Sequence, residues 1–348
     1  MCLKIIVVGA GVAGLASAAM LRAGADVTIF ERGDASQVAG GQGLAFGPNA
    51  VKIVEKFGYD RRRVRAVESK GIKAYDGATG ALIDPDTGVV TLENGETLQG
   101  DVIIVAAGIH TKIKEKIVGS SEYATTPTDQ SIFRVLVSSE NAQKVAGHLP
   151  DWWNPEVGAY LSVTRLNDGT NRAVITYPCR DFQYVNFSCA FPNEYLKQDA
   201  TESWFTDGDI NEVLDIFKDF PPPYREFMQY ADEVKVRELR DHDPLPTYVR
   251  GRAVLIGDAA HAMAPFQGQG AGQAIEDAEG LRLLLEPGVT PLDVPSILQQ
   301  WEAVRRPRAS QVQLNTRMAS KKLDEVNSFQ NMKYNWTYNG INEELKRA

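Results

Sequence analysis

The sequence predicts an α/β protein in which a parallel sheet is interleaved with an antiparallel sheet and followed by C-terminal helices. Three observations predict this fold. The N-terminus has the pattern of a strand, a glycine turn, a helix and another strand. A similar unit of strand, glycine-rich turn and helix comes late, at residues 253–280. Several strand-like segments lie between these two units. The chain is therefore expected to leave the parallel sheet and return to it.

The N-terminal unit is the most regular part of this pattern. Residues 3–8 are a continuous apolar run, as in a strand buried on both faces, and residues 12–21 are rich in Ala and Leu, as in a helix. Gly9 and Gly11 lie between the strand and the helix, and Gly14 lies near the start of the helix. A second strand, 26–30, ends in Glu31, where an acid can bond a ribose 2′-hydroxyl. This context predicts a dinucleotide site.

The N-terminal fingerprint leaves the choice between FAD and NAD open, because both carry an ADP moiety. An acid at Glu31 argues against a 2′-phosphate at this site, since two anions would face each other.

The late glycine-rich turn has its own chemistry. Asp258 follows the short apolar strand 253–256, at the edge where open α/β sheets contact their ligands. Glycines at 268, 270 and 272 let the backbone approach a flat group closely. The following helix begins with only Gly and Ala, so its free N–H groups and positive dipole end favour an electron-rich group.

The block from Gly257 to Gly272 resembles the second flavin motif of the group A FAD-dependent monooxygenases, the relatives of para-hydroxybenzoate hydroxylase and salicylate hydroxylase. The resemblance implies that FAD is the cofactor. It also implies that Asp258 binds the ribityl chain, that Pro265 lies against the isoalloxazine ring as a catalytic residue, and that Gly270 to Gly272 face the pyrimidine edge. The other cofactor-binding residues expected from the two motifs and the loop at 40–50, which covers the ring in this family, are Gly9, Gly11, Gly14, Glu31, Arg32, Gly43, Ala45, Gly257, Gly268 and Ala271.

The middle of the chain is expected to form an antiparallel sheet that roofs the flavin and holds the substrate. Its strand-like segments are residues 132–137, 159–163, 173–177 and 184–190. Arg134 matches an Arg on the first roof strand of the family and is a candidate catalytic residue that pairs with an anionic substrate, the flavin or a nicotinamide phosphate. A surface salt bridge is the alternative for this residue.

The remaining elements follow from local signals. Pro48 and Asn49 open a helix at 50–57, and Asn94-Gly95 predicts a hairpin within 89–98. Two helices, 295–305 and 308–323, are expected to join at Pro307, and the tail after Leu323 is expected to be irregular. The predicted organisation is a first part of the FAD-binding domain at 1–119, a substrate region at 120–245, a second part of the FAD-binding domain at 246–290, and C-terminal helices and tail at 291–348.

Composition excludes several classes of function. The formal net charge of −8 gives no general attraction to nucleic acid or anionic lipid. Three cysteines and four histidines show neither a disulfide framework nor metal-ligand spacing, and no apolar run is long enough to span a bilayer. A reduced, cytoplasmic setting fits; the oligomeric state has no signal. His261, inside the late motif, is expected to pack beside the flavin loop rather than transfer protons.

Two departures from the family pattern stand out. Ala107 occupies the position of an Asp that helps the family bind FAD, and losing one charge-assisted hydrogen bond should weaken cofactor binding by about 1–3 kcal/mol. In addition, Ile83 runs directly into Asp84, where the family has a further segment that carries a helix. A natural deletion and an incorrect gene model would both produce this junction.

The resemblance implies a complete reaction. NADH or NADPH reduces FAD, the reduced flavin reacts with O₂ to give a C4a-hydroperoxide, and a small aromatic, polyketide or terpenoid is hydroxylated or epoxidised. Two other classes stay open: a flavin enzyme that does not oxygenate, and a truncated, weakly flavin-binding or inactive relative. The absence of a Trp-x-Trp-x-Ile motif counts against a flavin halogenase.

Overall fold

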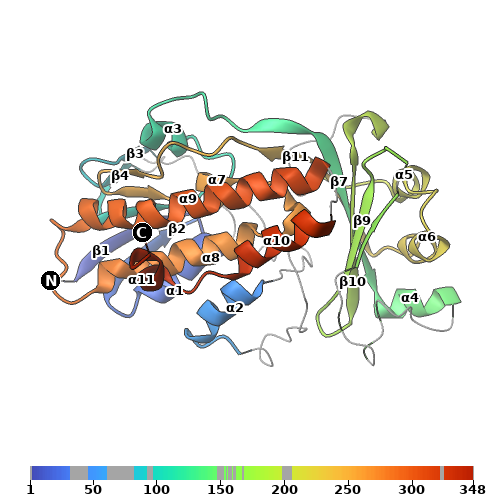
Figure 1. Ribbon diagram of the computed structural model, residues 1–348, viewed down its shortest axis with the longest axis horizontal. Coiled ribbons are helices and arrows are strands. Elements are labelled where there is room, and N and C mark those ends of the chain that lie inside the picture. Colours follow the sequence, from blue (N-terminus) through green and yellow to red (C-terminus); the bar gives the residue numbers. More distant parts are fainter. Residues whose placement is uncertain are drawn as a thin grey trace.

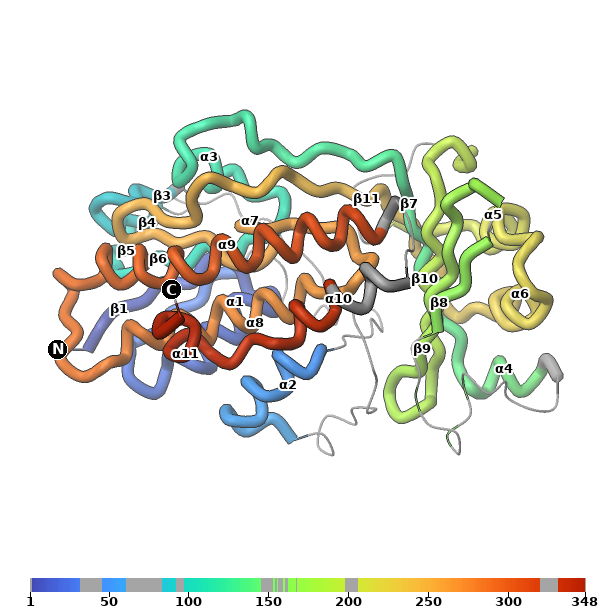
Figure 2. Tube along the Cα trace, viewed as in Figure 1, coloured from blue at the N-terminus to red at the C-terminus, as the bar shows by residue number. Residues whose placement is uncertain are grey.

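The computed structural model describes residues 2–31, 46–60, 82–91, 97–146, 153, 155, 159, 162–166, 168–197, 206–321 and 325–347. Figure 1 shows an elongated molecule with a helix-covered parallel sheet at one end and an antiparallel sheet standing across the other. Both chain ends lie in the helical part, as the tube in Figure 2 makes clear. The described residues contain no helix that is both long enough and apolar enough to cross a membrane, and no group of three metal-ligating side chains.

The parallel sheet is built from strands that are far apart in the chain. Its order is β12-β13-β6-β1-β2, and only β12 is antiparallel to its neighbour. These strands are β1 (Leu3–Val8), β2 (Ala25–Phe30), β6 (Val102–Val105), β12 (Val249–Arg250) and β13 (Ala253–Leu255). Because β13 pairs directly with β6, the chain does return to its first sheet after an excursion, as predicted. We call this sheet and the helices on it the nucleotide domain.

The central strand β6 is buried on both faces, with helices and the small sheet described below packed on this core. The helices of the nucleotide domain are α1 (Val12–Leu21), α2 (Pro48–Glu55), α3 (Ile113–Val118), α7 (Asp258–His261) and α8 (Gly270–Gly280), with 3₁₀ turns at Pro265–Gln267 and Leu281–Leu285. The helix α1 packs on β1 and β2, and α3 packs on β12 and β13. The predictions of α1 and α2 are confirmed to within a few residues.

A small antiparallel sheet packs at the edge of the nucleotide domain. It contains β3 (Leu82–Asp84), β4 (Val89–Thr91) and β5 (Thr97–Gln99). The predicted pairing of β4 with β5 is confirmed, while the turn residues Asn94 and Gly95 lie outside the described residues. Ile83 and Val90 are buried in the main core, so the junction at 83/84 lies in a strand that contributes to that core.

The second large sheet, which we call the roof sheet, is antiparallel and has the order β11-β7-β10-β9-β8. Its strands are β7 (Thr126–Ser138), β8 (Ser162–Arg165), β9 (Ala173–Cys179), β10 (Tyr184–Pro192) and β11 (Glu233–Asp241). Figure 1 shows α4 (Ser139–Ala146), α5 (Ile210–Ile216) and α6 (Pro222–Met228) on its outer side. A 3₁₀ turn lies at Asn193–Tyr195.

Alternation along β7 defines the two faces of the roof sheet. Phe133, Val135 and Val137 belong to an apolar cluster with residues of α5 and α6. The residues between them, including Arg134, therefore point to the opposite face, toward the nucleotide domain.

Two expectations for the C-terminus are wrong. Residues 294–321 form one helix, α9 (Val294–Lys321), with Pro307 inside it, rather than two helices. Proline removes one backbone hydrogen bond, but Arg305 and Arg308, on either side of it, are both anchored on α8 and hold the helix together. The tail is not irregular either, because α10 (Glu325–Trp336) and α11 (Ile341–Leu345) follow. Ile341 is buried, and the Tyr338 hydroxyl bonds Glu279 of α8.

Candidate functional site

The N-terminal halves of α1 and α8 meet beside Gly257, two residues after β13. A methyl group added to Gly257 would lie 2.9 Å from the Cβ of Ala13 on α1 and 3.7 Å from the Cβ of Ala274 on α8. Gly257 itself has a φ of 60°, which favours glycine. The two glycine motifs that are far apart in the sequence therefore form one site at the carboxyl edge of the parallel sheet.

The N-terminal ends of both helices can bind a negatively charged or electron-rich group. Neither the N-cap of α1, Gly11, nor that of α8, Gln269, makes a side-chain capping bond, and neither first turn carries an acid. Their first N–H groups have no partner inside their own helices, and the helix dipoles add positive potential there. Two such ends side by side suit a dinucleotide with a diphosphate and a polar ring, which is the fit that FAD requires.

The first glycine turn is too tight for other residues. A Cβ on Gly14 would lie 2.0 Å from the carbonyl oxygen of Gly9. Gly9 has a φ of 104°, and its added Cβ would lie 2.6 Å from the oxygen of Ala106, at the end of β6. At the tip of this turn the carboxylate of Glu31 accepts a hydrogen bond of 2.7 Å from the Ala10 amide. Glu31 thus lies where the sequence places the ribose-binding acid.

The second motif forms a compact loop. Asp258 is half-buried at the first position of α7, and Pro265, also half-buried, opens the 3₁₀ turn before Gly268. A Cβ on Gly272 would lie 3.1 Å from the Asn49 side-chain nitrogen, so the start of α2 lies against the start of α8. Three further predicted contacts, Arg32, Gly43 and Ala45, lie outside the described residues.

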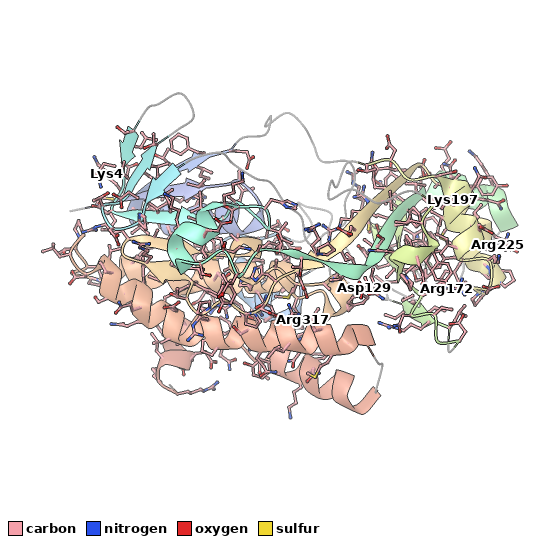
Figure 3. All side chains as sticks on the ribbon, turned by 90° about the horizontal axis from the view of Figure 1, so that it is seen from above. Lys4, Asp129, Arg172, Lys197, Arg225 and Arg317 are labelled. Atoms are coloured by element: carbon pink, nitrogen blue, oxygen red, sulfur yellow. The ribbon has the colours of Figure 1, made fainter. Side chains whose placement is uncertain are left out.

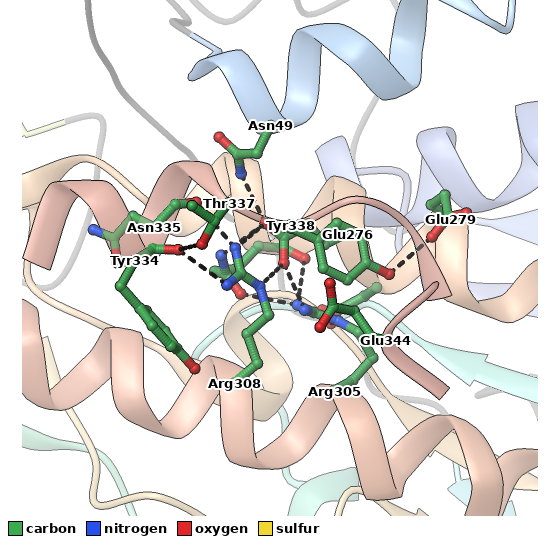
Figure 4. A network of polar contacts seen from close by, with 12 residues as sticks. Asn49, Glu276, Glu279, Arg305, Arg308, Tyr334, Asn335, Thr337, Tyr338 and Glu344 are labelled. Atoms are coloured by element: carbon green, nitrogen blue, oxygen red, sulfur yellow. Dashed lines mark hydrogen bonds and ion pairs between the residues drawn. The ribbon is translucent and has the colours of Figure 1, made fainter. Parts of the chain in front are cut away.

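A buried charge network, drawn in part in Figure 4, fixes this loop to the helices behind it. One carboxylate oxygen of Asp277 accepts from the Gly257 amide at 2.9 Å and contacts the His261 Nε2 at 2.6 Å. Its other oxygen accepts from the Nε of Arg305 at 3.0 Å. Burial acts to raise the pKa of Asp277, but the nearby His261 and Arg305 outweigh it and hold this pKa below the ordinary value.

The neighbouring acid, Glu276, holds the outer half of the network (Figure 4). It accepts from Arg305 at 2.6 Å, from Arg308 at 2.6 and 2.8 Å, and from the Asn49 amide of α2 at 2.8 Å. Arg308 also donates to the backbone oxygens of Tyr334 and Asn335 on α10. One network therefore ties α2, α8, α9 and α10 together.

We did not predict this network from the sequence, although adjacent acids and an arginine-rich segment could have indicated it. Glu276 and Asp277 are adjacent acids in a helix of small residues, and two of the three arginines in Arg305-Arg306-Pro307-Arg308 pair with them. The interpretation of His261 as a packing residue agrees with its position, because its ring is fully buried against Asp277.

The roof sheet carries one predicted site residue, Arg134, and several polar residues that were not predicted from the sequence. Arg134 is 6% exposed and forms an ion pair with Glu233 on the neighbouring strand β11. Beside it on β10, Asn186 donates to the Ser188 hydroxyl at 2.8 Å, and both side chains are fully buried. At the other edge of the sheet, the Arg165 guanidinium lies 5.8 Å from the centre of the Phe266 ring, in the loop that contains Pro265.

The family comparison agrees with this architecture. Residues 79–316 match the family described as FAD binding domain, and residues 3–145 match the family described as pyridine nucleotide-disulphide oxidoreductase. Among solved structures, a salicylate hydroxylase substrate complex superposes with a TM-score of 0.76 at 24% identity, covering 99% of this chain and 97% of that one. CtdE in complex with FAD gives 0.74 at 22% identity, with both chains fully covered.

Curated relatives carry the same activity in their names. An FAD-dependent monooxygenase of Nectria sp. is 27% identical, with 92% of this chain and 84% of the relative aligned. Hispidin-3-hydroxylase of Neonothopanus nambi is also 27% identical, over 88% and 86%. The alignment with the Nectria protein runs over 369 positions, more than the 348 residues of this chain, so that relative carries residues that this chain lacks. Since the family match covers more than half of its length, the chain belongs to the FAD-binding family of group A monooxygenases, and it is an FAD-dependent enzyme of this kind.

Proposed function

We propose that this enzyme uses NADH or NADPH and O₂ to hydroxylate or epoxidise a small aromatic, polyketide or terpenoid molecule. The observation that carries the proposal is the pair of uncapped helix starts that meet beside Gly257. When bound, FAD would supply the redox chemistry between the nicotinamide and O₂.

The chain's own groups hold and surround the cofactor. We assign the diphosphate to the turn at Gly9, Gly11 and Gly14 and a ribose hydroxyl to Glu31. Asp258 would hold the ribityl chain, and Pro265 would contact the ring. The start of α8 would stabilise negative charge on the pyrimidine edge of the ring, because its backbone N–H groups lack capping side chains.

The roof sheet then supplies the substrate side. Its inner face carries the Arg134–Glu233 pair and the Asn186–Ser188 pair, all held by hydrogen bonds or charge. We propose that this face orients the substrate over the ring and keeps water away from the activated oxygen. Arg134 takes part as one half of its ion pair.

The direct test is oxygen insertion by FAD-loaded protein. NADPH and NADH are each supplied with a panel of phenols under labelled ¹⁸O₂, and O₂ uptake and product mass are recorded. The proposal expects one compound to stimulate uptake and to gain one labelled oxygen atom. Nicotinamide oxidation that yields only hydrogen peroxide with every compound would contradict it.

A second candidate function is a relative that has lost flavin binding. Ala107 and the junction at 83/84 motivate it. Against it, the strands around the junction pack into the core, where Ile83 and Val90 are buried. A folded protein that retains no FAD would favour this second candidate.

A further inference from the structure

Three arginines at or near the roof sheet are paired with acids. Arg134 pairs with Glu233, and Arg240 pairs with Glu238. Arg317, on α9, bonds both Asp241 and Asp243. Each of these charges is already compensated, so none attracts a further anion strongly.

Arg165 differs from them. It ends the edge strand β8, and the preceding residue, Thr164, contacts the Tyr224 hydroxyl of α6 on the outer face. Because side chains alternate along a strand, Arg165 points to the inner face. Its contacts agree: one guanidinium nitrogen donates to the Ala319 carbonyl of α9 at 3.3 Å, and the group lies over the Phe266 ring.

The charge of Arg165 has no carboxylate partner among the described residues. Within the described part of the chain, Arg165 contacts a backbone carbonyl and an aromatic ring, and its buried Nε makes no hydrogen bond there. The side chain is half-buried, and burial lowers the pKa of Arg165 with no acid to offset it. A guanidinium nevertheless remains charged at neutral pH. A partly desolvated cation of this kind is stabilised when an anion reaches it.

We propose that Arg165 is the specificity residue that binds an anionic oxygen group, a carboxylate or a phosphate, on a molecule that reaches the flavin beside the Pro265–Gln267 turn. Two molecules can carry that group: the substrate, as a carboxylate, or the nicotinamide cofactor, as a phosphate. The inference rests on the proposed function, since it concerns the same site. It moves the anion-binding role from Arg134, which Glu233 neutralises, to a residue that the sequence did not single out.

The experiment uses FAD-loaded protein and two matched aromatic probes, salicylate and phenol, which differ by one carboxylate. Binding is followed through the change in flavin absorption. Unmutated protein should bind salicylate more tightly than phenol, and Arg165→Gln should weaken salicylate at least tenfold while phenol changes less than twofold. Arg165→Lys, which keeps the charge, should recover part of the loss.

The second arm measures anaerobic reduction of the bound flavin by NADPH and by NADH. If the anion is a phosphate of the nicotinamide cofactor, Arg165→Gln raises the apparent dissociation constant of that cofactor and not the dissociation constant of salicylate. Arg225→Gln is the matched control, because Arg225 is exposed on α6 at the far side of the roof sheet (Figure 3). FAD content and the thermal midpoint should be equal in all variants.

The outcomes separate the two proposals. Equal weakening of salicylate and phenol, or no change in either arm, would overturn the role of Arg165. Probe binding and flavin reduction need no oxygen insertion, so failure of the monooxygenase reaction with a positive Arg165 result would reject only the proposed function.

Discussion

The nucleotide domain and the inner face of the roof sheet differ in how their charged side chains are compensated. In the nucleotide domain, Arg305 and Arg308 face Glu276 and Asp277, and each carboxylate has several donors. On the inner face of the roof sheet, Arg134 pairs with Glu233, whereas the half-buried Arg165 has no carboxylate partner among the described residues. The difference teaches that the cofactor side is a fixed scaffold, while the substrate side keeps a charge available for a ligand.

Breaking the fixed network should have the largest effect. In Arg305→Leu, the fully buried Asp277 and Glu276 lose a shared cation, and the unfolding free energy should fall by about 3–5 kcal/mol. Urea unfolding measures it. Arg306→Leu is the control, because Arg306 is 38% exposed and lies 3.9 Å from Glu302, and it should change stability by less than about 1 kcal/mol. Equal losses in both variants would refute a special role for the network.

The second prediction concerns His242, where β11 leads from the roof sheet back to the nucleotide domain. Burial, helped by Lys114, lowers its pKa from 6.5 to about 4. The unfolded chain therefore binds the proton more readily, so stability is unaffected above pH 6.5 and is lost as pH falls toward 4. The loss amounts to about 3 kcal/mol at most. His242→Asn should lose less stability than the unmutated protein between pH 7 and pH 4.5 in urea titrations. Parallel pH curves for the two proteins would contradict this.

The third prediction tests the cofactor side at Ala107, which is fully buried at the end of β6 beside the Gly9 turn. Ala107→Asp restores the acid that the family resemblance places there. It should tighten FAD binding by about 1–3 kcal/mol, which is roughly 5-fold to 150-fold, in a fluorescence titration of apoprotein. Ala107→Asn, which lacks the charge, should gain less. Weaker binding in both variants would show that the surrounding chain has adapted to alanine.

The smallest effect is expected from the roof sheet. Glu233→Gln removes the negative charge that pairs with Arg134 and so raises the positive potential on the inner face. Salicylate should then bind more tightly by about 1 kcal/mol, a few-fold change, while phenol stays constant. The flavin absorption titration used for Arg165 measures it. Unchanged salicylate affinity would mean that Arg134 does not face the bound probe.

The same contrast explains what the sequence could predict. The cofactor site depends on close backbone packing, which requires glycine at positions such as Gly9, Gly14 and Gly257 and is therefore visible in the sequence. The return of the chain to the parallel sheet at β13 followed from these motifs. The continuity of α9 through Pro307 did not, because it depends on Arg305 and Arg308 reaching α8. Likewise, the pairing of Arg134 depends on an acid of the adjacent strand, and this acid, Glu233, lies far from Arg134 in the sequence.

The most direct test of the central claim is the visible absorption spectrum of purified protein that has been incubated with FAD and then freed of unbound flavin. The two helix starts beside Gly257 predict one FAD per chain, and Gly14→Ala should lose it, because the added methyl group would lie 2.0 Å from the Gly9 oxygen. Leu15→Ala, at an exposed position of the same helix, should keep the flavin. A folded protein without flavin would contradict the account and would direct attention to Ala107 and the 83/84 junction.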